Sequence, residues 1–291
     1  MEINSEKIKL SIVVPVYNEE EIIIQVINDL KKALSQLNLE YEIIAVNDGS
    51  SDKSGEILET IREIKIINHP YNRGYGASLK TGIKNSKYDW ILIIDADGTY
   101  PTESISKLIE KTREYDLVIG SREGKNVAIP IERKYAKRFL NKFASYLAGR
   151  KIPDLNSGLR LFRKDIVFKY WDLFPDRFSF TSTLTMVCLT HGYETAFVPI
   201  SYNKRSGKSS LRPTAFFSFL KLVIKLSLFF RPIRVFGPIS LFILMGAVFV
   251  AVAFFIGITP KFLDTTFVVL CATALQTFFF GLLAEIIAYN K

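Results

Sequence analysis

Short apolar runs alternate with longer amphipathic stretches over the first 120 residues of the chain. The apolar runs have the length of strands, and the stretches between them have the length of helices. Strands are expected at 9–16, 41–47, 64–69, 90–95 and 116–120, with helices near 19–36, 52–62, 75–86 and 101–114. This alternation predicts an α/β fold in which a mostly parallel sheet is covered by helices on both faces.

Polar segments follow all five expected strands. They read PVYNEE (15–20), NDGSSD (47–52), HPYNRGYG (69–76), DADGTYP (95–101) and GSRE (120–123). Any one of them could have an ordinary structural role. Asp48 with Gly49 would suit a turn, and Pro101 would suit the first turn of a helix. In an open parallel sheet, however, ligands bind at the carboxyl ends of the strands. Five polar segments at one edge of one sheet therefore favour a binding site.

The apolar pattern changes in the last quarter of the chain. Residues 235–258 and 265–284 contain no charged side chain, and each segment can cross a hydrocarbon core of about 30 Å. Two transmembrane helices are expected, at about 235–258 and 265–287, and a pair of buried core helices is the alternative. Lysine and arginine lie mainly outside the connecting loop, so the positive-inside rule predicts that the large domain and both termini are cytoplasmic.

The pattern divides the chain into three parts. Residues 1–212 are expected to form the α/β domain, 213–234 a juxtamembrane helix and 235–291 the transmembrane hairpin. In the middle part, Ser218, Lys221 and Lys225 fall on one helix face, and phenylalanines and leucines fill the others. This distribution predicts an amphipathic helix that lies in the membrane interface, with an ordinary core helix as the alternative.

Two segments come close to nucleotide-binding motifs without matching them. GYGASLKTG (74–82) has Leu79 where the dinucleotide motif needs its third glycine, and it follows the third expected strand rather than the first. GKSS (207–210) has Tyr202 where the phosphate loop needs its first glycine. The sequence therefore supports neither hydride transfer nor ATP hydrolysis by a phosphate loop.

Asp95 and Asp97 are two residues apart at the end of the fourth expected strand. In an extended chain such side chains point to the same side, where two carboxylates repel each other unless a cation lies between them. Carboxylate oxygens suit Mg²⁺ or Mn²⁺. An ion held there could neutralise a departing diphosphate, although the Asp-x-Asp pattern alone is common by chance.

The chain has two histidines, His69 and His191. His69 lies at the end of the third expected strand and could contact a nucleotide, but a structural role is the favoured interpretation. His191 precedes Gly192 and is expected at the end of a helix.

Taken together, six segments resemble the inverting glycosyltransferases of family 2, which have the Rossmann-like GT-A fold. The segments are PVYNEE, NDGSSD, NRGYGASLKTG, DADGTYP, SR and DLNSGLRLFRK, and the resemblance extends over roughly residues 8–212. Within this family the chain looks like the polyprenyl-phosphate branch, typified by dolichol-phosphate mannose synthase and the bactoprenol glucosyltransferases. The QxxRW signature of processive synthases is absent from the sequence, so transfer of one sugar per event is expected.

The resemblance implies a donor side and an acceptor side. On the donor side, the nucleoside of a sugar nucleotide would be held by Pro15, Tyr17, Glu19 and Asp48. The loop along the nucleotide would contain Gly76 and Lys80. The sugar diphosphate and a Mg²⁺ or Mn²⁺ ion would be bound by Asp95 and Asp97. On the acceptor side, Arg122, Arg133, Arg205 and Lys208 would meet phosphates, and Asp154, Asn156 and Ser157 would form the acceptor loop. The catalytic residues it implies are Asp95, Asp97, Arg122 and Arg205.

The sequence departs from the family pattern in three places. Thr99 stands where a glutamine often completes the metal shell. Ser210 stands where a lysine is usual, which leaves Arg205 and Lys208 to carry the charge. The segment TSTLTMV (181–187) lacks the acidic residue that serves as general base in members acting on sugar hydroxyls.

The missing base bears on the acceptor. A hydroxyl must lose a proton as it attacks, and it needs a positioned carboxylate or histidine for this. A phosphomonoester is already anionic at pH 7, because its second pKa is about 6, and it needs cations instead. An absent base, a formal net charge of +9 and a membrane anchor together indicate a lipid phosphate acceptor.

The sequence therefore predicts a membrane-anchored, metal-dependent glycosyltransferase that moves one sugar from a UDP- or GDP-linked donor to dolichyl or undecaprenyl phosphate, with inversion, at the cytoplasmic face. One alternative is transfer to a glycolipid hydroxyl with Asp154 as the base. A second alternative is a membrane scaffold or translocation helper without activity. Association of several chains in the membrane is compatible with so small a hairpin, and no nucleic-acid partner is expected.

Overall fold

One seven-stranded sheet forms the centre of the described part of the chain. The computed structural model describes residues 8–37, 39–127, 131–177, 179–203, 221, 224–225, 227–229, 231–258, 261 and 264–289, with the backbone alone at 124–127 and 131–137. The strands are β1 (Lys9–Val16), β2 (Glu40–Asn47), β3 (Lys65–Asn68), β4 (Trp90–Ile93), β5 (Leu117–Val127), β6 (Arg160–Arg163) and β7 (Thr195–Tyr202). Their order is β3-β2-β1-β4-β6-β5-β7, and β6 runs antiparallel to both of its neighbours while the other pairs are parallel.

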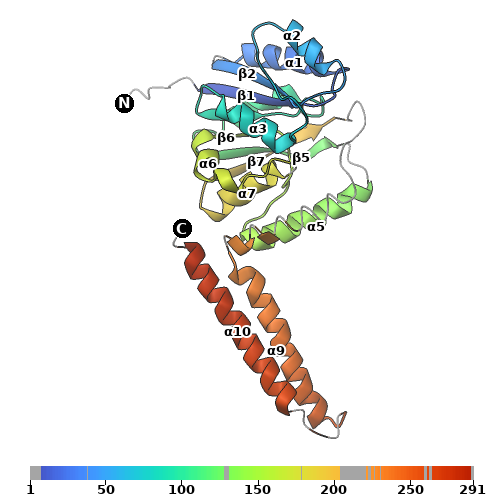
Figure 1. The fold of residues 1–291 in the computed structure, drawn as a ribbon, viewed down its shortest axis with the longest axis vertical. Coiled ribbons are helices and arrows are strands. Elements are labelled where there is room, and N and C mark those ends of the chain that lie inside the picture. Colours follow the sequence, from blue (N-terminus) through green and yellow to red (C-terminus); the bar gives the residue numbers. More distant parts are fainter. Residues whose placement is uncertain are drawn as a thin grey trace, which may run out of the picture.

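Helices cover both faces of the sheet (Figure 1). One face carries α1 (Ile23–Ser35), α2 (Ser54–Thr60) and α4 (Ile105–Ile109), and the other carries α3 (Tyr75–Lys84), α6 (Lys164–Lys169) and α7 (Phe180–Thr190). Short 3-10 turns lie at Thr102–Ser104 and Trp171–Leu173. The mostly parallel sheet between two helical layers confirms the expected fold class.

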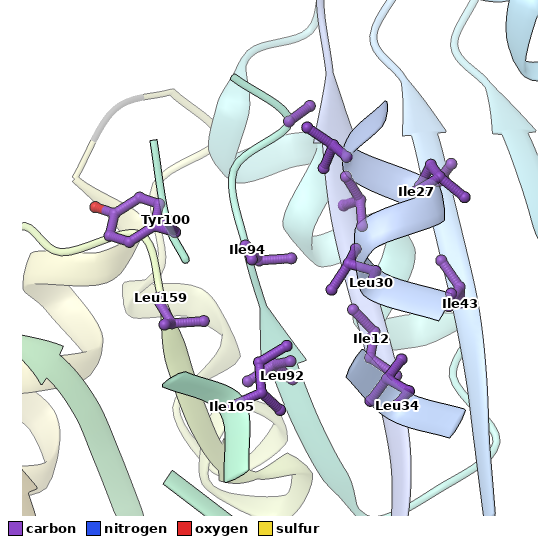
Figure 2. Close-up of a cluster of buried hydrophobic side chains, with 14 of the residues drawn as sticks. Ile12, Ile27, Leu30, Leu34, Ile43, Leu92, Ile94, Tyr100, Ile105 and Leu159 are labelled. Atoms are coloured by element: carbon purple, nitrogen blue, oxygen red, sulfur yellow. The ribbon is translucent and has the colours of Figure 1, made fainter. Parts of the chain in front are cut away.

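β1 shows how the apolar pattern gives this two-sided burial. Leu10, Ile12 and Val14 are fully buried in the cluster that contains the inner face of α1, whereas Val13 is fully buried in the cluster that contains α3 and α7. Figure 2 shows Ile27, Leu30 and Leu34 of α1 beside the sheet. A strand buried on both faces reads as a continuous apolar run, which is the pattern of this segment.

All five expected strands are present, and two further strands were not predicted. β6 is four residues long and has an arginine at each end, so it gives little apolar signal. β7 contains Pro199, which argues against a central strand; the structure resolves this conflict by placing β7 at the edge of the sheet, where proline is tolerated. β5 continues to Val127, beyond the predicted end at 120.

The two C-terminal helices form an antiparallel pair that extends away from the sheet (Figure 1). α9 (Ile233–Phe255) and α10 (Asp264–Tyr289) are long and apolar enough to cross a membrane, and 11% of the most apolar part of each is buried. Large apolar side chains such as Phe242 and Phe280 are exposed, so the alternative of buried core helices is wrong. The Ser240 hydroxyl donates to the Ala274 carbonyl (2.7 Å) and holds the pair together. Of the expected juxtamembrane helix, the described residues 221, 224–225 and 227–229 are helical.

α5 (Ile131–Ala148) lies between the sheet domain and the hairpin (Figure 1). Its inner face, including Ala144 and Leu147, packs with Met186 and Leu189 of α7. Its C-terminal end meets the start of α9, because Arg234 donates to the Tyr146 carbonyl and the Tyr146 hydroxyl donates to the Arg234 carbonyl. We call these contacts of Tyr146 and Arg234 the α5–α9 junction.

Candidate functional site

The end of β4 carries Asp95 and Asp97. The Tyr75 hydroxyl donates to Asp95 Oδ1 (2.8 Å), and burial together with this carboxylate raises the pKa of Tyr75 well above its usual value, so the hydroxyl remains a donor. Asp97 is 8% exposed, and one of its oxygens, Oδ1, accepts the Thr99 hydroxyl (2.6 Å) and the Thr99 N–H (3.2 Å). Both carboxylates are therefore oriented by hydrogen bonds to their own neighbourhood.

Asp48, at the end of β2, holds the loop that leads into α3. It is buried and accepts the N–H groups of Arg73 (2.9 Å) and Gly74 (2.8 Å). His69 Nδ1 lies 2.7 Å from Asp48 Oδ1, and His69 Nε2 lies 2.9 Å from the Thr81 hydroxyl. With both ring nitrogens engaged inside the protein, His69 has the contacts expected of a structural histidine.

The segment after β1 is joined to the segment after β2. The Asn18 side chain accepts the Ser51 N–H (2.8 Å), and the Glu19 N–H donates to the Ser54 hydroxyl (2.8 Å). Tyr17, which follows Pro15 and Val16 of β1, is 42% exposed at this edge. The structure thus brings the segments of Tyr17, Glu19 and Asp48 to one place and leaves an aromatic ring accessible there.

Gly76 and Lys80 lie against a different partner, the loop 175–177. The N–H groups of Gly76 and Ala77 donate to the carbonyls of Arg177 (3.1 Å) and Asp176 (2.7 Å). A Cβ at Gly76 would lie 2.1 Å from the Pro175 carbonyl oxygen, so glycine is required for this approach. Protein carbonyls therefore occupy the start of α3, in agreement with the missing dinucleotide motif.

Two cavities border these elements. One, of about 140 Å³, is lined by residues that include Asp95, Gly98, Tyr100 and Asn203. The other, of about 380 Å³, lies beside α3 and is lined by residues that include Lys80, Trp171 and Asp176. Lys80 forms an ion pair with Asp176 (2.8 Å). The structure therefore places Lys80 and Asp95 at different cavities.

Asp154 and Arg122 form a bidentate ion pair. Arg122 Nε donates to Asp154 Oδ2 (2.7 Å), Arg122 Nη2 donates to Oδ1 (2.8 Å), and Asp154 is fully buried. Burial alone lowers the pKa of Arg122, but Tyr100 and the Asp154 carboxylate raise it well above its usual value. The guanidinium also lies over the Tyr202 ring, 5.2 Å from its centroid. The Asp154 carboxylate thus fixes the orientation of the Arg122 guanidinium.

Sequence reasoning missed Arg160, a fully buried arginine at the start of β6. It donates to the carbonyls of Ser157 (2.6 Å), Leu155 (2.7 Å) and Thr181 (2.7 Å), and to the Thr185 hydroxyl. Burial lowers its pKa to about 10, so it remains charged at neutral pH. A charged residue between Leu159 and Leu161 was the signal that could have identified it.

The loop 154–158 connects the two sides of the site. The Asn156 side chain accepts the Ser182 hydroxyl, and the Ser157 hydroxyl donates to the Gly120 carbonyl. At the other end of the loop, a Cβ at Gly158 would lie 2.2 Å from Asp95 Oδ2, and the Gly158 N–H donates to the Tyr100 hydroxyl (2.6 Å). The same short loop therefore contacts Asp95 and, through Asp154, Arg122.

Three expected cationic residues fall outside this description. The side chain of Arg133, on α5, is not among the described ones, and Arg205 and Lys208 lie beyond Asn203, outside the described residues. Their expected roles stay predictions. Asn203, which directly follows β7, is the last described residue before Arg205 and Lys208, and its N–H donates to the Thr99 carbonyl (2.9 Å).

The donor set at β4 fits a divalent ion that is shared with a ligand. Among the described residues, no group of three or more histidine, cysteine, aspartate or glutamate side chains is arranged to hold a metal. Asp95 and Asp97 offer two carboxylates, and Mg²⁺ in proteins is commonly held by one or two carboxylates together with substrate phosphates. Asp95 and Asp97 would supply part of the ligand set of such an ion, and phosphate groups of a bound substrate would complete it.

Comparison with known proteins gives consistent results. An undecaprenyl-phosphate 4-deoxy-4-formamido-L-arabinose transferase of Proteus mirabilis (strain HI4320) is 36% identical over 168 residues, which cover 56% of this chain and 51% of that protein. An uncharacterized protein of Methanocaldococcus jannaschii is 33% identical over 210 residues, 68% of this chain and 82% of that protein. The chain thus spans about half the length of the first relative.

Among solved structures, glucosyl-3-phosphoglycerate synthase from Mycobacterium tuberculosis, in complex with Mn²⁺, UDP and phosphoglyceric acid, matches with a TM-score of 0.60 at 16% identity, over 75% of this chain and 78% of that one. At this identity the match concerns the fold, and it agrees with the expected GT-A architecture. The family described as "Glycosyl transferase family 2" matches residues 11–171, more than half of the 291 residues. The matched region contains Asp48, Asp95, Asp97 and the loop 154–158. The chain therefore belongs to glycosyl transferase family 2.

Proposed function

We propose that this protein transfers a single sugar from a nucleotide sugar to a polyprenyl phosphate at the cytoplasmic face of a membrane, with inversion at the anomeric carbon. The observation that carries the proposal is the state of Asp154. It is fully buried and bound by two nitrogens of Arg122, and it is the carboxylate that a hydroxyl acceptor would need as a base. In the described part of α7, serines and threonines stand where an acidic residue would otherwise serve.

The donor side is assigned as follows. Tyr17 holds the nucleoside, with its exposed ring available to stack on the base, and Asp48 supports this side by holding the loop that leads into α3. Asp97, with Asp95, holds a divalent ion, either Mg²⁺ or Mn²⁺, that supplies positive charge to the departing diphosphate. Pro15 and Glu19 border the nucleotide path, whereas Gly76 packs against the loop 175–177 and Lys80 faces a different cavity. The Mn²⁺–UDP complex of the structural neighbour supports a nucleotide bound with a divalent ion, and the name of the Proteus mirabilis relative supports undecaprenyl phosphate as the acceptor.

On the acceptor side, a phosphate oxygen of the lipid attacks the anomeric carbon, and the bond to the diphosphate breaks with its electron pair leaving on the diphosphate oxygen. The attacking oxygen carries no proton above its second pKa of about 6, so no base is required. Arg122, oriented by Asp154, contacts the acceptor phosphate, and Arg133, Arg205 and Lys208 add positive charge. Asn156 and Ser157 keep the loop in place between Arg122 and Asp95.

Purified full-length protein, a panel of UDP- and GDP-linked sugars, Mn²⁺ or Mg²⁺ and a short polyprenyl phosphate test this proposal. We expect a labelled lipid product that is hydrolysed by mild acid, as a sugar phosphate diester is, and no product with the matching polyprenol. Asp97→Ala should abolish transfer. An acid-stable product made on a glycolipid would establish the hydroxyl alternative, and the absence of any transfer across the panel would favour the scaffold alternative.

A further inference from the structure

We propose that Thr99 is a positioning residue for the metal-binding carboxylate of Asp97. Thr99 is fully buried, and its hydroxyl donates to Asp97 Oδ1 at 2.6 Å. Its own N–H reaches the same oxygen at 3.2 Å. This inference rests on the proposed function, because it assigns a role to Thr99 within the proposed metal site.

Thr99 acts through Asp97 and not on the ion. The hydroxyl hydrogen is given to Asp97, and the side chain has no exposed surface from which it could reach a ligand. A glutamine at this position is expected to complete the metal shell directly, whereas the shorter threonine is turned back toward the carboxylate. Thr99 would therefore influence the ion through the Asp97 carboxylate, whereas a glutamine would contact the ion itself.

The turn between the two residues makes this contact possible. Gly98 has a φ of +69°, a conformation that L side chains rarely adopt, and it returns the chain so that Thr99 faces the preceding carboxylate. The short hydroxyl contact to a charged oxygen is the stronger of the two hydrogen bonds, and it fixes the rotamer of Asp97. Hydrogen bonds to ligating carboxylates typically change metal affinity by about 10–100-fold.

Thr99 is itself held from the other side. Its carbonyl accepts the N–H of Asn203 (2.9 Å), and the next residue, Tyr100, packs edge-on against Tyr202 at 5.2 Å between ring centroids. The turn at 97–99 is thus fastened to the end of β7. This second attachment holds the backbone of Thr99 from outside the turn.

A purely structural turn would give the same hydrogen bonds, so the test must separate metal affinity from stability. Thr99→Val removes the hydroxyl and keeps the shape, Thr99→Ser keeps the hydroxyl, and Thr112→Val is the matched control, since its hydroxyl donates to the Ile109 carbonyl (2.7 Å) at the end of α4. Binding of Mn²⁺ to the full-length protein with UDP is followed by the electron paramagnetic resonance signal of free Mn²⁺, and thermal melting is recorded for each variant.

We expect the apparent Kd for Mn²⁺ to rise about 10–100-fold in T99V and to stay within about threefold in T99S and T112V. Wild-type affinity in T99V, with a loss of thermal stability alone, would overturn the inference, and so would a tenfold loss in T99S. If T99V does not fold, T99A carries the same expectation. Asp97→Ala separates the two levels: equal Mn²⁺ binding by wild type and D97A refutes the proposed metal site, whereas loss in D97A without loss in T99V refutes the role of Thr99 alone.

Discussion

Asp154 and Asp97 are both buried carboxylates, yet their partners prepare them for different tasks. The two oxygens of Asp154 face the fork of Arg122, which neutralises its charge inside the protein. Asp97 accepts hydrogen bonds from the hydroxyl and the N–H of Thr99, and both of these donors are neutral groups. A carboxylate of the second kind suits a cation, and one of the first kind suits the orientation of an arginine.

Asp154→Asn tests this division. The amide keeps the shape but removes the charge opposite Arg122, and the loss of a charged hydrogen bond of about 1.5–3 kcal/mol corresponds to roughly a 10–100-fold change. We expect the KM for polyprenyl phosphate to rise by that factor while the donor KM and kcat change little, as measured by steady-state kinetics. Asp165→Asn, which breaks the exposed pair with Arg163, is the control. A collapse of kcat with an unchanged acceptor KM would instead identify Asp154 as the base.

At the scale of elements, β6 explains both the site and what sequence reasoning could not find. The parallel strands β1, β2 and β4 leave the sheet at the ligand edge, and polar residues after such strands are readily recognised. β6 runs the other way, so the chain enters the sheet at that edge and the residues before the strand contribute to the site. The sequence of β6, RLFR, contains no local pattern that predicts the reversed direction, because this direction follows from the pairing of β6 with β4 and β5.

The same distinction separates the site residues. The place of Asp95 and Asp97 after a strand could be predicted, because the apolar pattern of β4 is clear. The ion pair of Arg122 with Asp154 and the contact of Gly158 with Asp95 join positions far apart in sequence, and tertiary structure alone reveals them. Thr99 was recognised as unusual, yet its partner could be named only once the turn at Gly98 was known.

Arg160 carries the prediction at this scale, because it joins β6, the loop 154–158 and α7. Arg160→Met removes four hydrogen bonds and leaves the carbonyls of Leu155, Ser157 and Thr181 without this donor. We expect the free energy of unfolding to fall by about 3 kcal/mol or more, since each of these three buried groups costs about 1–3 kcal/mol when left unsatisfied. Thermal or denaturant melting of the full-length protein measures this.

Arg163→Met is the matched control for that experiment. It lies on the same short strand, but its side chain is 53% exposed and pairs with Asp165 at the surface, so its substitution should change stability by no more than about 0.5 kcal/mol. Equal melting curves for the two variants would show that the buried arginine does not hold the loop against α7.

At the scale of the whole molecule, the described residues show specific contacts between the hairpin and the sheet domain. Glu285, near the end of α10, accepts the Ile233 N–H (3.0 Å) and so joins the two helices at the end nearest the sheet domain. One residue later, Arg234 forms the α5–α9 junction with Tyr146. A cation at the C-terminal end of α5 also interacts favourably with the dipole of that helix.

Arg234→Ala should loosen this attachment without unfolding either part. We expect faster hydrogen exchange in the last turns of α5 and a several-fold lower rate of transfer to polyprenyl phosphate in nanodiscs, with Mn²⁺–UDP binding unchanged. Arg231→Ala removes the same charge three residues earlier and serves as the control. Unchanged exchange in α5 would contradict the role of the junction.

Contacts run without interruption from α9 to α5, from α5 to α7, and from the first turns of α7 through Arg160 to the loop 154–158. Under the proposed function, this series holds the loop at a constant height above the hydrocarbon, where the phosphate of a lipid lies. The isoprene tail of the acceptor then lies in the bilayer interior, which the loop does not enter, so the loop does not contact the tail. Acceptors with short and long tails should accordingly be equivalent substrates once both are embedded in the same membrane.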